Sequence, residues 1–113
     1  MRYPFHALVE DNPLGEPVGY YELNNFPGCN QIVVSNHSCI YPQHRGKGLG
    51  KALSVEKLSV AKNEGYDYAI ATVVGSNSPQ LAIMESNGWT LLDTFFNRES
   101  GNEVNIFGRR LSE

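Results

Sequence analysis

The chain has 113 residues, of which nine are Lys or Arg and twelve are Asp or Glu, so its formal net charge is -3. A chain of this size buries enough surface to fold without a metal or disulfide, and its 41% hydrophobic content is not that of a disordered protein. We therefore expect one globular domain spanning residues 1–113. The mild acidity argues against a nucleic-acid or anionic-membrane binder, since such proteins need a basic surface.

The two cysteines predict neither a metal site nor a disulfide framework. Cys29 and Cys39 form no CxxC pair and have no paired His spacing, so we expect two free thiols. The N-terminal residues lack the pattern of a secretory signal, and no apolar run approaches the roughly 18 residues needed to span a bilayer. The sequence therefore favours a cytoplasmic protein.

The first third of the chain predicts three strands. Phe5 to Val9 meets a turn cluster at residues 11–15, and Val18 to Leu23 closes with a second cluster at 24–28. Together they predict an antiparallel hairpin. Ile32 to Tyr41 has apolar ends around a polar middle, which predicts a long third strand.

A helix of about four turns is expected after this strand, beyond Pro42 and a glycine-rich stretch at 45–50. Its apolar residues recur at helical spacing. They are Leu49, Ala52, Leu53, Val55, Leu58, Val60 and Ala61. We expect the solvent side to carry Lys51, Glu56, Lys57 and Lys62. Gly65 provides the C-terminal stop.

The last part predicts a central strand, a short helix and a hairpin. Tyr68 to Val74 is nearly continuously apolar, which is typical of a strand covered on both faces. Pro79 suits the first turn of a helix that ends at Asn87-Gly88. Trp89 to Phe96 and Val104 to Phe107 flank a polar loop. The order is therefore β-β-β-α-β-α-β-β, an α+β fold with a mixed sheet.

The junction between the third strand and the first helix predicts an anion site. Three glycines fall within five residues there, and a helix N-terminus offers free amides and a positive dipole end. Arg45 and Lys47 add positive charge. A P-loop would need Gly at position 45 and Ser or Thr at position 52, where this chain has Arg45 and Ala52. A dinucleotide fingerprint would need Gly at position 51 or 53, where this chain has Lys51 and Leu53. Neither motif matches.

The pattern that does match is Q/R-x-x-G-x-G/A. Gln43, Gly46 and Gly48 satisfy it in one register, and Arg45, Gly48 and Gly50 satisfy it in a second. The alternative interpretation of these glycines is a tight turn with a helix cap.

A second motif follows at the expected separation, where Asn77 precedes a short helix that ends at Gly88-Trp89. On these two motifs the chain resembles the GNAT family of acyl-CoA-dependent N-acyltransferases, over roughly residues 5 to 110. The resemblance implies a GNAT-like mixed sheet and acetyl-CoA as the acyl donor.

The resemblance also implies which residues bind the cofactor. The amides of the glycine-rich loop would hold the pyrophosphate, main-chain groups at the end of the third strand would meet the pantetheine and thioester, and Asn77 would bind the pantetheine arm. The implied set is Cys39, Ile40, Gln43, Arg45, Gly46, Lys47, Gly48, Leu49, Gly50 and Asn77. For Asn77 the alternative is a helix cap, and both roles are compatible.

The catalytic groups usual in the family are missing. The resemblance implies a Tyr acid seven residues after Asn77, where this chain has Met84, and a thioether cannot donate a proton. Ser78 or a water could substitute, although a serine near a helix start is more often a cap. The usual base is a Glu on the third strand, but Ile32 to Tyr41 contains no carboxylate, so the role falls to His37. The alternative for His37 is a hydrogen-bonded strand residue.

The resemblance leaves the acceptor open. Family members usually have a strand and two helices before the first hairpin, whereas only Met1 to Pro4 precede it here. The acceptor side would then be covered by a second copy or another protein, or stay wide for a bulky amine. We expect an acetyl-CoA-dependent N-acetyltransferase acting on a primary amine by direct attack. The alternative is a GNAT-fold module that binds CoA or a protein without turnover.

Overall fold

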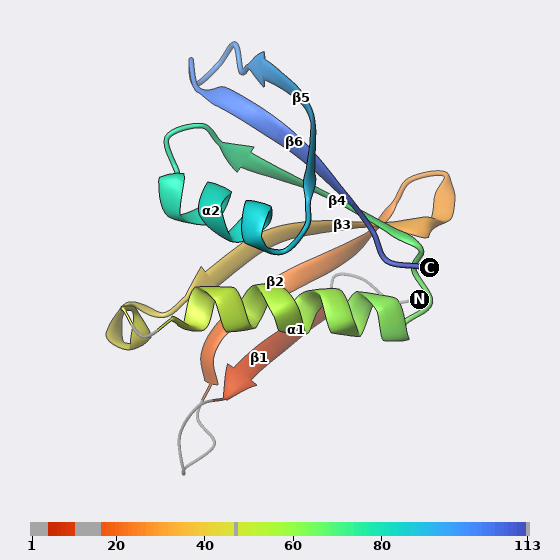
Figure 1. Ribbon diagram of the computed structural model, residues 1–113, viewed down its shortest axis with the longest axis vertical. Coiled ribbons are helices and arrows are strands. Elements are labelled where there is room, and N and C mark those ends of the chain that lie inside the picture. Colours follow the sequence, from red (N-terminus) through yellow and green to blue (C-terminus); the bar gives the residue numbers. More distant parts are fainter. Residues whose placement is uncertain (1–4, 11–16, 47, 113) are drawn as a thin grey trace.

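The computed structural model describes residues 5–10, 17–46 and 48–112, with backbone only at 5–10, 17, 36 and 37. Its strands and helices follow the predicted order (Figure 1). They are β1 (Phe5–Glu10), β2 (Pro17–Phe26), β3 (Cys29–Ile40), α1 (Leu49–Asn63), β4 (Tyr68–Val74), α2 (Ser78–Ser86), β5 (Thr90–Phe96) and β6 (Glu103–Arg110). One 3-10 turn, η1 (Pro42–His44), lies between β3 and α1.

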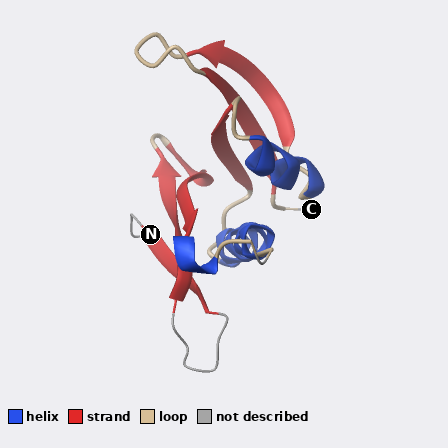
Figure 2. Cartoon of the chain, turned by 90° about the vertical axis from the view of Figure 1, so that its left-hand side faces the viewer, coloured by secondary structure: helices blue, strands red, loops and turns tan. Residues whose placement is uncertain are grey.

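The strands form one six-stranded sheet in the order β1-β2-β3-β4-β6-β5. Only β3 and β4 run parallel, and the other neighbours are antiparallel. Parallel neighbours need a crossover, which α1 provides. Figure 2 shows that the sheet is strongly curled rather than flat. The mixed sheet predicted from the sequence is confirmed.

Helix α1 packs against the N-terminal half of the sheet. Tyr21 and Leu23 of β2 and Val33 of β3 are buried, as is Leu53 of α1. The Tyr21 hydroxyl donates to Glu56 on α1 at 3.2 Å. Burial, and next the negative charge of Glu56, raise the pKa of Tyr21 well above its ordinary value, so the phenol stays a neutral donor. This bond fixes α1 over β2.

Two predictions about strand boundaries and coverage are wrong. Asn24 to Phe26 do not form a turn but extend β2, where Asn25 pairs with Val33, and only Pro27-Gly28 turn the chain. Strand β4 is not covered on both faces, because Thr72 and Val74 are exposed while Val73 is buried. The exposed positions lie where β3 has separated from β4.

Strand β5 forms the edge of the sheet next to β6. All seven of its residues are exposed, including Leu91, Phe95 and Phe96, because β5 pairs on one side only. Among the described residues, no helix is long and apolar enough to cross a membrane.

Candidate functional site

The glycine-rich loop joins the end of β3 to the start of α1. Pro42 begins η1, and the chain then passes through Gly46 and Gly48, whose φ angles are +83° and +77°. Residues with a side chain rarely adopt this left-handed region, so glycine is required here by backbone conformation. Steric crowding is not the reason, because a Cβ at either position would meet no described atom within 4 Å other than those of its chain neighbours.

The first amides of α1 have no side-chain acceptor, because the N-cap residue is Gly48. His44 donates its amide to Tyr41 O and Arg45 to Pro42 O, whereas the amides of Gly46 and Gly48 meet no main-chain acceptor among the described residues. The first turn of α1 also lacks acidic residues. The loop therefore presents unsatisfied donors to an open, positively charged surface, which suits an anion.

Arg45 is partly committed to the fold. Its Nε donates to the carbonyl oxygen of Ile40 at 2.8 Å, and its Nη2 lies 3.8 Å from Cys39 Sγ. The guanidinium thus ties the loop to the end of β3 while its charge stays at the exposed surface. Both Cys39 and Cys29 are free thiols and half-buried, as expected.

Strands β3 and β4 separate beside this loop. Their parallel pairing runs from Ile32 with Tyr68 to Ser35 with Ala71 and then ends, although both strands continue. On its other side β3 contains a bulge, since Tyr20 pairs with Cys39 but Glu22 pairs with Asn36. An extra residue in one strand bends it and sharpens its twist, which accounts for the divergence. Main-chain groups on the facing edges are left for another partner.

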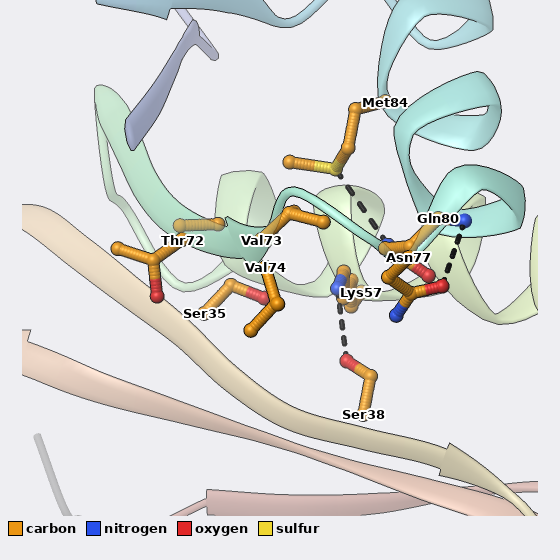
Figure 3. Close-up of a pocket in the computed structure, with 10 residues that line it drawn as sticks. Ser35, Ser38, Lys57, Thr72, Val73, Val74, Asn77, Gln80 and Met84 are labelled. Carbon is orange, nitrogen blue, oxygen red and sulfur yellow. Dashed lines mark hydrogen bonds between the residues drawn. The ribbon is translucent and has the colours of Figure 1, made fainter. Parts of the chain in front are cut away.

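A cavity of about 230 Å³ occupies this opening (Figure 3). It is lined by Ser35, Ser38, Lys57, Ala71, Thr72, Val73, Val74, Asn77, Gln80 and Met84. A smaller cavity of about 70 Å³ shares Ser38, Lys57 and Gln80 with it and extends to Gly50 at the start of α1. The two cavities together connect the glycine-rich loop with the gap between β3 and β4.

Helix α2 supplies the far wall of the larger cavity. Asn77 is its N-cap, accepting from Gln80 N at 3.4 Å, and it also lines the cavity. Met84 is buried in the same wall, and its sulfur accepts from Gln80 Nε2 at 3.7 Å. The wall thus offers an amide side chain and a thioether, neither of which is an acid.

The other predicted residues are placed as follows. Cys39 and Ile40 line the smaller cavity with Gly50, while Gln43 is exposed in η1 and Leu49 is buried in the first turn of α1. Ser78 begins α2 and is exposed, but it does not line either cavity.

Two predicted residues lie outside the description. His37 belongs to β3 within the bulged segment, but its side chain is not among the described ones. Lys47 is not described at all.

The sequence analysis missed Lys57 and Ser35. Lys57 is not on the solvent side of α1 but on its buried face, where it is 4% exposed. The signal was present, since Leu49, Leu53, Lys57 and Ala61 recur every four residues and share one helix face. Ser35 is 5% exposed, and its Oγ finds no hydrogen-bond partner among the residues that the structure describes. Both side chains line the larger cavity.

Comparison with known proteins settles the family. The model of the acetyltransferase (GNAT) family matches residues 2–89. The chain belongs to this family. YwnH of Bacillus subtilis (strain 168), provisionally named a phosphinothricin acetyltransferase, is 28% identical over 115 aligned positions, which cover 96% of this chain and 69% of YwnH.

Solved GNAT structures share the fold. One, provisionally described as a phosphinothricin N-acetyltransferase, superposes with a TM-score of 0.82 at 28% identity. The match covers 96% of this chain and 68% of the other. The phosphinothricin acetyltransferase of Sinorhizobium meliloti, solved in complex with acetyl-CoA, superposes with a TM-score of 0.79 at 23% identity. The match covers 96% of this chain and 61% of the Sinorhizobium protein. The overall fold of the chain is therefore the one seen in these solved structures.

Proposed function

We propose that the protein is an acetyl-CoA-dependent N-acetyltransferase that transfers the acetyl group to a primary amine by direct attack. The observation that carries the proposal is the continuity between the anion-binding loop and the gap between β3 and β4. A CoA thioester has a diphosphate at one end and a reactive carbonyl at the other, and the two sites are suited to these two groups.

The residues present fit this cofactor. The amides of Gly46 and Gly48, which have no main-chain acceptor among the described residues, and those of the first turn of α1 would supply donors for the diphosphate. The pantetheine would pass Cys39 and Ile40, whose segment lines the smaller cavity. The Ile40 carbonyl already accepts from Arg45, so a ligand amide would share this oxygen. Bound acetyl-CoA supplies the activated carbonyl.

The reaction requires a neutral amine and donors for the oxyanion of the tetrahedral intermediate. Main-chain amides on the unpaired edge of β3, beyond Ser35, would provide such donors. His37 remains our predicted base. Glu22 of β2 is a second candidate for the base, because it pairs with Asn36 at the bulge. Its neighbours Tyr21 and Leu23 are buried on the side of α1. Since side chains alternate along a strand, Glu22 lies on the opposite side of the sheet.

The acceptor is proposed only by class. Because the similar proteins reported above carry phosphinothricin acetyltransferase names, phosphinothricin is the first amine to test, together with a peptide and polyamine panel. The acceptor-side coverage by a second copy or another protein, expected from the resemblance, remains a prediction.

A second function is favoured by one observation. Met84 occupies the cavity wall where the resemblance implies a proton donor, which would suit a module that binds CoA without turnover. Isothermal titration with acetyl-CoA and CoA, followed by thiol release with the amine panel, separates the two. Binding with amine-dependent thiol release supports the transferase. Binding without release from any amine supports the module, and absence of binding refutes both.

A further inference from the structure

Lys57 is a buried cation that faces no counter-charge in the part of the chain that the structure describes. It is 4% exposed, and its Nζ donates to Ser38 Oγ at 2.9 Å. Among the described residues lining the two cavities there is no Asp, Glu or His. A buried ammonium without a charged partner is costly, so a protein that retains one has either a use for it or a ligand that pairs with it.

The position of Lys57 indicates the use. It lines both cavities, the smaller one that reaches Gly50 and the larger one in the opening between β3 and β4. Figure 3 shows Lys57 in the larger cavity with Ser35, whose buried Oγ has no hydrogen-bond partner among the described residues. Two buried polar groups with unused hydrogen-bonding capacity therefore line the cavity where the proposed function would place the thioester.

Few other titratable groups lie around Lys57 among the described residues. From β3, Cys39 lines the smaller cavity and its sulfur contacts Arg45. On α1 itself, Glu56 is engaged by Tyr21 of β2. The described lining residues of β4 and α2 include no titratable group. Of the described groups here, Lys57 has the proton best suited to transfer.

We propose that the Lys57 ammonium is the proton donor to the sulfur of the departing CoA thiolate, an inference that rests on the proposed function. The amine nitrogen attacks the thioester carbon, the C–N bond forms, and the C–S bond breaks with its electron pair remaining on sulfur. Sulfur then takes a proton from Lys57 Nζ and leaves as CoA thiol. The new amide nitrogen releases its extra proton to the base of the proposed function, His37 or Glu22, and both the base and Lys57 return to their starting protonation states by exchange with water.

The acidity of Lys57 is compatible with this role. Burial lowers its pKa to about 8, close to the ordinary thiol value of about 8.5. Proton transfer between groups of similar pKa is efficient near neutral pH, and the ammonium form is present below about pH 8. Ser38, which accepts a hydrogen bond from Nζ, orients the donor within the opening.

The first test needs no acceptor amine. CoA is bound to the wild type and to Lys57→Met, and the thiol is titrated by its thiolate ultraviolet absorbance, with CoA lacking the sulfur as the blank for protein thiols. We expect the ammonium to lower the pKa of the bound thiol by at least about one pH unit, and Lys57→Met to abolish the shift. Bound CoA with the same thiol pKa in both proteins would overturn the inference while leaving the proposed function intact. Failure of the wild type to bind CoA would refute the proposed function and the inference with it.

The second test separates proton transfer from charge. Turnover of whichever amine of the panel gives thiol release with the wild type is compared for Lys57→Met, Lys57→Arg and Lys62→Met, the last an exposed lysine of the same helix. We expect kcat to fall about 100-fold in both Lys57 variants, with acetyl-CoA affinity changed less than about threefold, since a positioned acid contributes roughly 100- to 10,000-fold. The decline of wild-type kcat above about pH 8 should be absent from Lys57→Met. Wild-type kcat in Lys57→Arg would show that charge alone suffices and would overturn proton donation.

Discussion

Replacing Lys57 with Met should make the protein more stable while impairing turnover. The ordinary pKa of 10.5 falls to about 8 in the folded chain, solely through burial. At about 1.4 kcal/mol per pH unit, this shift corresponds to about 3 kcal/mol of destabilisation when Lys57 is charged in both states. Losing the 2.9 Å bond to Ser38 offsets about 1 kcal/mol of the gain. We therefore expect Lys57→Met to raise the free energy of unfolding by about 2 kcal/mol at pH 7.

The pH dependence gives the sharper test. Between the folded pKa of about 8 and the unfolded value of 10.5, the unfolded chain binds more protons, so wild-type stability rises with pH across this range. The advantage of Lys57→Met should shrink accordingly and be close to zero near pH 9.5. Urea denaturation at pH 7 and pH 9.5 measures it, with Lys62→Met as an exposed control that we expect to stay within about 0.5 kcal/mol of wild type. A Lys57→Met protein that is less stable than wild type at pH 7, or a difference independent of pH, would refute the view of Lys57 as an unpaired buried charge.

Substitutions at three further positions test the site. Gly48→Val places a branched side chain at φ +77°, so we expect loss of measurable acetyl-CoA binding by calorimetry, and retained affinity would contradict the loop assignment. Asn77→Asp keeps an oxygen that can cap α2, so we expect its stability to be unchanged, whereas Asn77→Ala loses the cap and about 1 kcal/mol of stability. Contact between Asn77 and the cofactor predicts that Asn77→Asp nevertheless binds acetyl-CoA more weakly by calorimetry. His37→Ala should lower kcat at least about 100-fold and remove the acidic limb of the pH–rate profile. Unchanged turnover would exclude His37 as the base, and Glu22→Gln would then test the second candidate.

The fold was predictable because local signals and overall pattern agree. A proline and a glycine cluster mark the end of β3, and helical spacing then continues to Asn63, so the boundaries of α1 follow from sequence. The predicted bounds of β4 are also those observed. The coverage of a strand is different, because an apolar run does not reveal that β3 diverges from β4 beyond Ser35 and exposes Thr72.

The site was predictable only in its backbone part. The glycine motif indicates a loop with positive φ angles, and two of its three glycines have them. The role of side chains depends on which segments the fold brings together. Lys57 and Ser35 are 22 residues apart and share one cavity, a proximity that α1 packing on β3 creates and that no local motif records. Lys57 was assigned to solvent because its charge outweighed its position in the every-fourth-residue pattern.

A crystal structure of the protein with acetyl-CoA tests the central claim most directly. The account predicts the diphosphate within hydrogen-bond distance of the amides of Gly46, Gly48 and the first turn of α1, with the thioester between β3 and β4 and its sulfur near Lys57 Nζ. A diphosphate bound elsewhere on the surface, with the loop amides turned toward acceptors within the protein, would contradict it.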